Sequence, residues 1–179
     1  MSGAEMAVGL LSVSDRASRG DYQDRGVPGM QAWLQKVLIS PWRAVSAVVP
    51  DDFAEVCAAL RKMIDEDGCR LVLTAGGTGP APRDITPEAT RAVCEREIPG
   101  FGEEMRRANL RYVPTAILSR QTACVRGRAL VVNLPGQPKA AGETLDAVFA
   151  AVPYCLDLIG SPGMETDPEI LRAFRPAQK

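Results

Sequence analysis

The chain has 179 residues, 46% hydrophobic and 24% charged, with a formal net charge of −1 and no histidine. This composition is typical of a soluble globular domain, without an apolar run that could cross a membrane or a basic excess that would bind nucleic acid. The lack of histidine excludes a histidine base and histidine metal ligands, so carboxylates, Lys, Arg and backbone groups must carry any chemistry.

The five cysteines are scattered, odd in number and without a C-x-x-C pair. We interpret them as small buried residues in a reducing cytoplasm. At the N-terminus an acid precedes a short apolar segment, which does not resemble a secretory signal. We therefore expect one cytoplasmic domain that spans residues 1–179.

The first half of the chain alternates between strands and helices. Residues 6–13 form a continuous apolar run that predicts a buried strand, followed by the polar loop Ser14-Asp15-Arg16. Apolar spacing over 27–39 predicts a helix, and 45–49 predicts a second strand. Such alternation favours parallel βαβ units with right-handed crossovers.

Two aspartates follow the second predicted strand. Asp51 and Asp52 precede the clearest helical pattern, over 53–64, so either could be its N-cap. Because both also follow the carboxyl end of a strand, one could cap the helix while the other faces the crevice at the sheet edge.

The most informative stretch is 71–91, which contains a strand, a glycine loop and a helix start. The apolar residues 71–73 predict a strand buried on both faces, and Gly76, Gly77, Thr78 and Gly79 follow it. Glycines allow a sharp turn and a close approach to a ligand, although they also occur in simple connections. Thr86-Pro87-Glu88 predicts a helix start with Thr86 as N-cap, which places Asp84 on a rigid loop where anions are expected to bind.

The second half continues with less regular signals. A helix with a basic side is predicted over 101–112, where exposed charge is the default explanation of its arginines. Short apolar segments at 115–118 and 122–126 flank Ser119 and Arg120, and a strand over 129–134 ends in Pro135-Gly136-Gln137-Pro138. We expect one long helix over 140–159, bent near Pro153, and a final short helix over 167–174. The predicted fold is a three-layer α/β/α sandwich whose sheet is mostly parallel, with a short antiparallel edge.

Five ordered motifs together resemble the molybdopterin adenylyltransferase family of molybdenum-cofactor biosynthesis. They are Ser-Asp-Arg, Val-Val-Pro-Asp, Gly-Gly-Thr-Gly with Pro-Arg-Asp-Ile-Thr-Pro-Glu-Ala-Thr, Ala-Ile-Leu-Ser-Arg and Asn-Leu-Pro-Gly-Gln-Pro. The resemblance covers about residues 6–176 and is strongest to the stand-alone bacterial enzymes. It implies the molybdopterin-binding-domain fold and a Mg²⁺-dependent reaction in which the terminal phosphate of molybdopterin attacks the α-phosphate of ATP, giving adenylyl-molybdopterin and pyrophosphate.

The resemblance also assigns roles to residues. Asp51 and Asp84 match the family's two critical aspartates, which implies that they are catalytic and hold Mg²⁺. The glycine loop matches the phosphate and nucleotide loop. The remaining matched positions imply contacts with the pterin and the adenylate, and they are Ser14, Asp15, Arg16, Ser119, Arg120, Pro135, Gly136, Gln137 and Pro138.

Two departures from the family pattern are visible. Gln137 stands where many relatives have asparagine, and the region 139–149 is about a dozen residues shorter than we expect of similar bacterial proteins. The family is trimeric, so the apolar surface of the 140–159 helix could form an interface, although it could equally be core. Transient contact with other proteins of molybdenum-cofactor biosynthesis is also expected.

Two alternative functions remain open from the sequence. A binding module of the same fold could hold molybdopterin without transferring AMP. Another Mg²⁺-dependent nucleotidyl or phosphate-handling enzyme could use the same scaffold. The presence of both Asp51 and Asp84 favours the adenylyltransferase.

Overall fold

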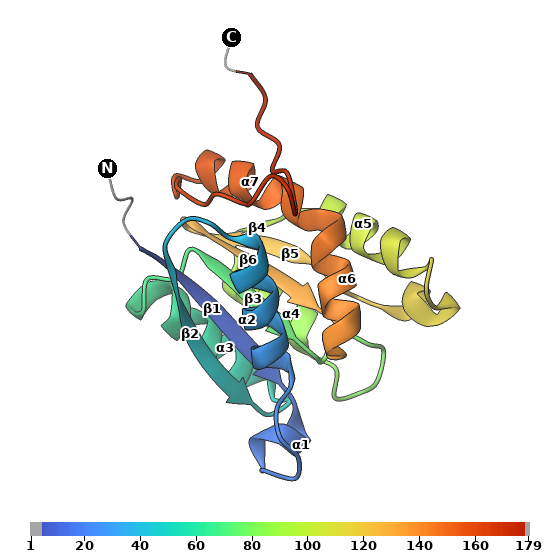
Figure 1. Ribbon diagram of the computed structural model, residues 1–179. Coiled ribbons are helices and arrows are strands. Elements are labelled where there is room, and N and C mark those ends of the chain that lie inside the picture. Colours follow the sequence, from blue (N-terminus) through green and yellow to red (C-terminus); the bar gives the residue numbers. More distant parts are fainter. Residues whose placement is uncertain (1–4, 178–179) are drawn as a thin grey trace.

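The computed structural model describes residues 5–177. Within this range six strands form one sheet in the order β2-β1-β3-β6-β5-β4. From β2 to β6 neighbouring strands are parallel, whereas β5 is antiparallel to both of its neighbours, which confirms the predicted mostly parallel sheet with a short antiparallel edge. The strands are β1 (Met6–Val13), β2 (Trp42–Val49), β3 (Leu71–Ala75), β4 (Arg96–Glu97), β5 (Ala123–Arg126) and β6 (Ala129–Leu134) (Figure 1).

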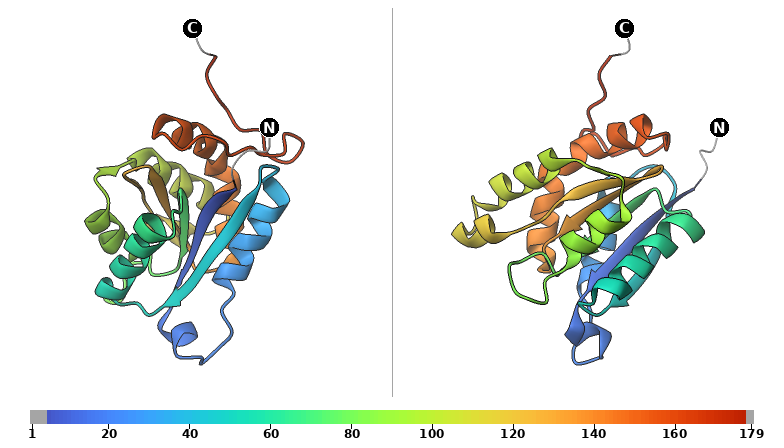
Figure 2. Two further views of the ribbon diagram at one scale, coloured as in Figure 1. Left: turned by 90° about the vertical axis from the view of Figure 1, so that its left-hand side faces the viewer. Right: turned by 180° about the vertical axis from the view of Figure 1, so that it is seen from behind.

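Helices cover both faces of the sheet, as the three-layer prediction requires (Figure 2). Helices α2, α5, α6 and α7 pack on one face, and α3 and α4 pack on the other. No helix within the described range has both the length and the apolar character of a bilayer span. The helices are α1 (Asp15–Ser18), α2 (Gly26–Val37), α3 (Phe53–Arg61), α4 (Thr86–Val93), α5 (Pro99–Asn109), α6 (Pro138–Val148) and α7 (Val152–Leu158).

The central strands are apolar throughout because both of their faces are buried. In β1, Val8 and Leu10 join the core beneath α2 and α6, whereas Ala7 and Leu11 join the core beneath α3. Burying one large aliphatic side chain stabilises the fold by about 1.5–3 kcal/mol. The alternating side chains of β1, β3 and β6 therefore fix the sheet between its two helical layers, and this in turn fixes the loops at the strand ends.

The C-terminal third differs from the sequence-based expectation in two ways. The predicted helix over 140–159 is two helices, α6 and α7, separated by the 3₁₀ segment Phe149–Ala151. The break is near Pro153, as predicted, and the proline lies in the first turn of α7, where a missing N–H costs nothing.

The predicted helix over 167–174 was wrong. Only one turn forms there, because the chain donates hydrogen bonds to other elements: Asp167 N to Val37 O at 2.8 Å and Phe174 N to Ala150 O at 3.0 Å. Tertiary hydrogen bonds replace those that a short helix would make within itself.

Candidate functional site

Four loops meet at the carboxyl edge of the parallel strands, after β1, β2, β3 and β6. Strand β2 pairs with one edge of β1 and β3 pairs with the opposite edge, so the order of the strands reverses between β1 and β3. This position is the topological switch point of the sheet. In open α/β sheets ligands bind in the crevice at such a point. The predicted site residues of all four loops therefore belong to one edge of the molecule.

The glycine loop needs its glycines because the backbone turns close to other backbone. Gly76 and Gly77 have φ angles of +102° and +64°. A Cβ atom at Gly76 would overlap the carbonyl oxygen of Val13, and one at Gly136 would lie 3.4 Å from the Cα of Gly76. The loop after β3 is thus packed between the ends of β1 and β6.

Thr86 anchors this loop instead of capping α4, which corrects the sequence-based prediction. Its hydroxyl donates to Gly76 O at 2.9 Å and its N–H donates to Gly77 O at 3.1 Å. The N-cap position is taken by Ile85, which makes no side-chain cap. Within residues 5–177 the hydrogen-bond network leaves the N–H groups of Gly77, Thr78 and Gly79 without an acceptor. Free N–H groups at this position favour an anion.

The sequence allowed either aspartate after β2 to cap α3, and in the structure Asp52 is the N-cap. Asp52 caps α3, accepting from the N–H groups of Ala54 and Glu55 at 3.0 Å each. Asp51 is therefore free for the crevice. A Cβ atom at Gly77 would lie 3.1 Å from Asp51 Oδ1, so this oxygen lies beside the glycine loop.

Asp84 lies beside the end of the glycine loop, at Gly79. Its Oδ2 accepts from the N–H of Ala81 at 2.9 Å, and a Cβ atom at Gly79 would lie 2.7 Å from the same oxygen. Burial raises the pKa of Asp51, and the negative charges of Asp15 and Asp84 raise this pKa further. The two predicted catalytic carboxylates are thus close enough to influence each other.

Asp15 is joined to Arg83 by a two-pronged ion pair. Arg83 Nε donates to Asp15 Oδ2 at 2.5 Å, and Nη2 donates to Oδ1 at 2.7 Å. The hydrogen bonds from Arg83 hold the pKa of Asp15 below its usual value. Ser14 caps the short helix α1, and the guanidinium of Arg16 lies 5.2 Å from the ring centre of Tyr22.

Arg120 binds the glycine loop, although it was expected to contact a ligand. Its backbone N–H donates to Thr78 O at 2.8 Å, Nε donates to Gly79 O at 2.8 Å and Nη2 donates to Asp84 O at 2.6 Å. Its Nη1 pairs with Glu88 on α4. Arg120 therefore connects the loop to the following helix.

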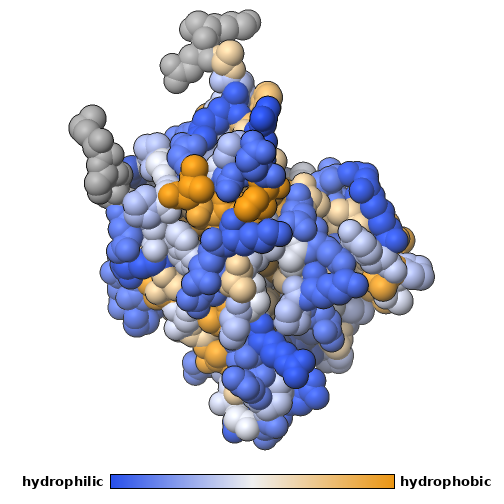
Figure 3. Space-filling model, in the orientation of Figure 1, coloured by the Kyte–Doolittle hydropathy of each residue, from blue (hydrophilic) through white to orange (hydrophobic). Residues whose placement is uncertain are grey.

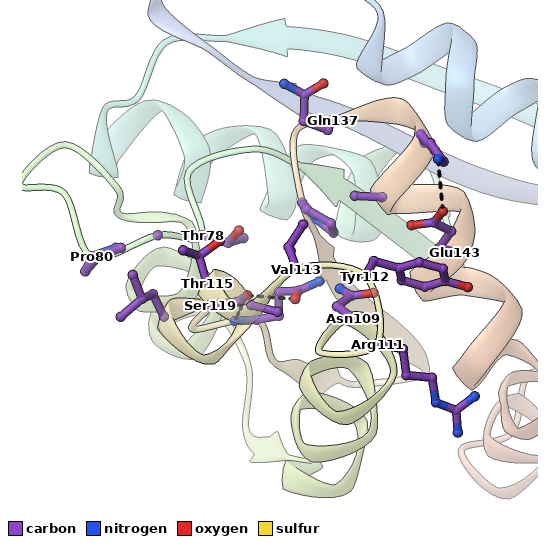
Figure 4. A pocket seen from close by; sticks show the side chains of 17 residues that line it. Thr78, Pro80, Asn109, Arg111, Tyr112, Val113, Thr115, Ser119, Gln137 and Glu143 are labelled. Atoms are coloured by element: carbon purple, nitrogen blue, oxygen red, sulfur yellow. Dashed lines mark hydrogen bonds and ion pairs between the residues drawn. The ribbon is translucent and has the colours of Figure 1, made fainter.

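The larger cavity at this edge measures about 820 Å³, and it lies beside the glycine loop, α5 and α6 (Figure 4). The predicted residues Thr78, Gly79, Ser119, Pro135 and Gln137 line it. The sequence analysis did not name several polar residues of its wall, which lie on α5 and α6 or in the turn after α5. These are Asn109, Arg111, Tyr112, Lys139 and Glu143.

A second cavity, of about 410 Å³, lies on the β1 side of the 135–138 loop. Its wall contains the predicted site residues Ser14, Arg16, Gly136, Gln137 and Pro138, and Gln137 borders both cavities. The wall also contains Tyr22 and Asp24, which the sequence analysis missed. Asp24 accepts from the hydroxyl of Ser12 at 2.6 Å and from the N–H of Val27 at 3.0 Å, so it fixes the start of α2.

The carboxylates of Asp51 and Asp84 suit a hard cation that also binds oxygen atoms of a ligand. In the described range no group of three or more acidic, Cys or His side chains could hold a metal by itself. Mg²⁺ commonly takes one or two carboxylates and completes its shell with water and phosphate oxygens. Asp51 and Asp84 fit this pattern, because each has an oxygen beside the glycine loop.

Comparisons with known proteins agree on one family. Residues 9–154 match the family described as a probable molybdopterin binding domain. The molybdopterin adenylyltransferase of Haemophilus influenzae is 52% identical over 185 aligned positions, covering 97% of this chain and 94% of that protein. The enzyme of the same name from Helicobacter pylori is 51% identical over 171 aligned positions, which cover 96% of this chain and 97% of that protein.

A solved structure shares the fold. The molybdopterin biosynthesis enzyme MoaB of Thermus thermophilus superimposes with a TM-score of 0.81 at 43% identity, covering 89% of this chain and 99% of that one. The alignment with the Haemophilus protein is longer than the 179 residues of this chain, so that relative contains residues that are lacking here.

Proposed function

Because this chain belongs to the molybdopterin adenylyltransferase family, we propose that it transfers AMP from ATP to the terminal phosphate of molybdopterin. The observation that carries the proposal is the position of Asp51 and Asp84 beside a glycine loop that borders a cavity and has three N–H groups without an acceptor among the described residues. The free N–H groups suit phosphates, and the carboxylates suit a cation that accompanies phosphates.

The reaction is a substitution at phosphorus. A phosphate oxygen of molybdopterin forms a bond to the α-phosphorus of ATP, and the bond between that phosphorus and the bridging oxygen of the β-phosphate breaks. Pyrophosphate leaves with the electron pair. Because the nucleophile belongs to the substrate, the protein needs no histidine base and no serine or cysteine nucleophile. Its contribution is to align the two phosphates and to stabilise the charge that develops on them.

Each part of the site has a task in this scheme. The N–H groups of Gly77, Thr78 and Gly79 bind phosphate oxygens of ATP. Asp51 and Asp84 would hold Mg²⁺, which when bound neutralises phosphate charge. The cavities on the two sides of the 135–138 loop receive the pterin and the nucleotide, and Gln137, which borders both, contacts their junction.

An assay with α-labelled ATP, Mg²⁺ and molybdopterin tests the proposal. We expect the label to appear in adenylyl-molybdopterin together with one equivalent of pyrophosphate. A protein that only binds molybdopterin would leave the label in ATP, which is the result expected of the binding-module alternative. Efficient competition by pterins without the terminal phosphate would instead favour a different nucleotidyl-transfer enzyme on the same scaffold.

The assembly that we propose is a cytoplasmic homotrimer. Most apolar residues over 140–159 are core, including Leu145, Phe149 and Leu156, so this stretch offers little apolar surface for an interface. Exposed apolar side chains remain at the end of this stretch, at Leu158, and nearby at Phe174, and Figure 3 shows hydrophobic surface gathered near α7 on an otherwise mainly hydrophilic face. Light scattering measures the oligomeric state. Transient contacts with other proteins of molybdenum-cofactor biosynthesis remain part of the proposal.

A further inference from the structure

We propose that Asp15 and Arg83 are positioning residues that fix the carboxylate of Asp51, and that Asp15 does not contact the substrates. This inference rests on the proposed function only because it takes Asp51 as a catalytic carboxylate. It revises the expectation that Asp15 contacts the ligands, since both oxygens of its carboxylate already accept hydrogen bonds from protein donors.

Asp15 and Asp51 hold each other by a reciprocal pair of hydrogen bonds. The N–H of Asp15 donates to Asp51 Oδ2 at 2.9 Å, and the N–H of Asp51 donates to Asp15 Oδ1 at 3.1 Å. The N–H of Ser14 adds a third link by donating to Val49 O at 2.9 Å. The loops after β1 and β2 are thus connected at the point where Asp51 leaves the sheet.

Arg83 extends this connection to the loop after β3. Its guanidinium donates to both oxygens of Asp15, at 2.5 Å and 2.7 Å. The planar guanidinium fixes the plane of the carboxylate that it binds with two bonds. The two oxygens of Asp15 therefore accept from three protein donors, the two of Arg83 and the N–H of Asp51, which leaves Asp15 poorly placed to bind a ligand.

The consequence is a defined orientation of Asp51. Its Oδ2 accepts from Asp15, while Oδ1 lies beside Gly77 on the face of the glycine loop. Loss of the Asp15 side chain would remove the acceptor of the Asp51 N–H and the ion-pair partner of Arg83. The loops that carry Asp51 and Arg83 would then be held less tightly, and the Asp51 carboxylate would adopt a wider range of orientations.

The alternative is that Asp15 and Arg83 form only a surface ion pair, because the side chain of Arg83 is 66% exposed. The chain contains a matched control for this reading. Arg126 donates to both oxygens of Asp65 at 3.1 Å and 2.6 Å, in a pair that is also partly exposed and lies at the amino-terminal edge of β3 and β6. Asp65→Ala removes an ion pair of the same kind without touching the crevice.

The experiment compares Asp15→Ala, Asp15→Asn, Arg83→Gln and Asp65→Ala with the wild type. We expect Asp15→Ala and Arg83→Gln to lower kcat by about 10–100-fold while the KM for ATP changes by less than about threefold, because misplacement acts on the transition state. Asp15→Asn keeps an oxygen that can accept from Asp51 N–H, so it should recover most of the loss in kcat. Asp65→Ala should keep the wild-type kcat.

Crystal structures of wild type and Asp15→Ala provide a readout that is independent of activity. We expect the Asp51 carboxylate to turn in the variant, and an unchanged carboxylate would overturn the inference. A large rise in KM at constant kcat would show that Asp15 contacts ATP, and an equal loss in Asp65→Ala would reduce the effect to general stability. If the wild type itself transfers no AMP, the proposed function fails, while the two crystal structures still decide the positioning role.

Discussion

Asp51 occupies a position where its negative charge is unfavourable. Burial raises its pKa, and the carboxylates of Asp15 and Asp84 raise it further, while the hydrogen bond from the Asp15 backbone and the charge of Arg83 oppose the rise. The fold alone would therefore not favour a carboxylate at this position. Such a conflict between local stability and charge is typical of residues retained for function.

The first prediction concerns Asp51→Asn. The pKa of Asp51 is raised in the folded state above its unfolded value of about 3.9. The folded state therefore favours protonated Asp51, and this contribution to stability is present below the unfolded pKa and is lost as the pH rises through the folded pKa. Asparagine removes the charge and keeps an oxygen for the Asp15 N–H. Thermal unfolding should give the variant a higher Tm than the wild type at pH about 7, with the difference vanishing near pH about 4. A lower Tm at neutral pH would contradict this account of Asp51.

The second prediction concerns Asp84→Asn. We expect AMP transfer to be abolished while the fold and oligomeric state are kept, because the side chain of Asp84 contacts the protein mainly through Ala81 N–H and asparagine retains an acceptor for it. The labelled-ATP assay measures transfer, and circular dichroism with light scattering measures fold and assembly. An unfolded variant would mean that Asp84 is a structural turn residue.

At the scale of elements, the glycine loop is held by the backbone of three strands, and this yields the third prediction. Gly76→Ala should lower the free energy of unfolding by about 1–3 kcal/mol or more. Alanine is strained at φ +102°, and its Cβ would overlap the carbonyl oxygen of Val13. Gly68→Ala is the matched control: its φ is +73°, and no atom lies within 4 Å of its added Cβ. Urea denaturation should show a clearly smaller loss for the control. Equal losses would mean that the crowding at Gly76 is unimportant.

The fourth prediction tests the connection between the loop and α4. Arg120→Ala removes two side-chain hydrogen bonds to loop carbonyls and the partner of Glu88, whose Oε2 is buried without a partner within the described residues. We expect a loss of about 1–3 kcal/mol in the free energy of unfolding and faster amide exchange over 78–84. Arg107→Ala breaks only the exposed pair with Glu104 and should give a clearly smaller loss of stability. Unchanged exchange over 78–84 would argue against this role.

At the scale of the whole molecule, the cysteines report on global unfolding. All five cysteines were predicted to be buried; Cys57, Cys69 and Cys124 are, whereas Cys94 and Cys155 are only partly buried. Burial raises the pKa of the Cys69 thiol to about 11 and also raises that of Cys57. As the fifth prediction, neither thiol should react with a thiol reagent at neutral pH until the protein unfolds, because the thiolate is the reactive form. Mass spectrometry of labelled peptides along a urea series measures this. Labelling of Cys69 before the unfolding transition would contradict it.

The sequence was most reliable where local signals and burial agree. The bounds predicted for β1 and β6, Met6–Val13 and Ala129–Leu134, are those of the structure, because an apolar run buried on both faces has few alternatives. It was least reliable where tertiary hydrogen bonds compete with local ones. Thr86 carries the signal of an N-cap but donates to Gly76, and residues 167–174 pair with distant elements instead of forming a helix.

The sequence by itself determined the four parallel strands, the loops at their carboxyl ends and the presence of two aspartates among them, because periodicity and glycine or proline signals depend only on near neighbours. Tertiary structure alone decided which groups these side chains meet. Asp15 contacts Asp51 across 36 positions and Arg83 across 68, and these contacts exist because β1 lies between β2 and β3 in the sheet. The order of strands depends on packing of the whole domain, so no local pattern could identify Asp15 as a partner of Asp51.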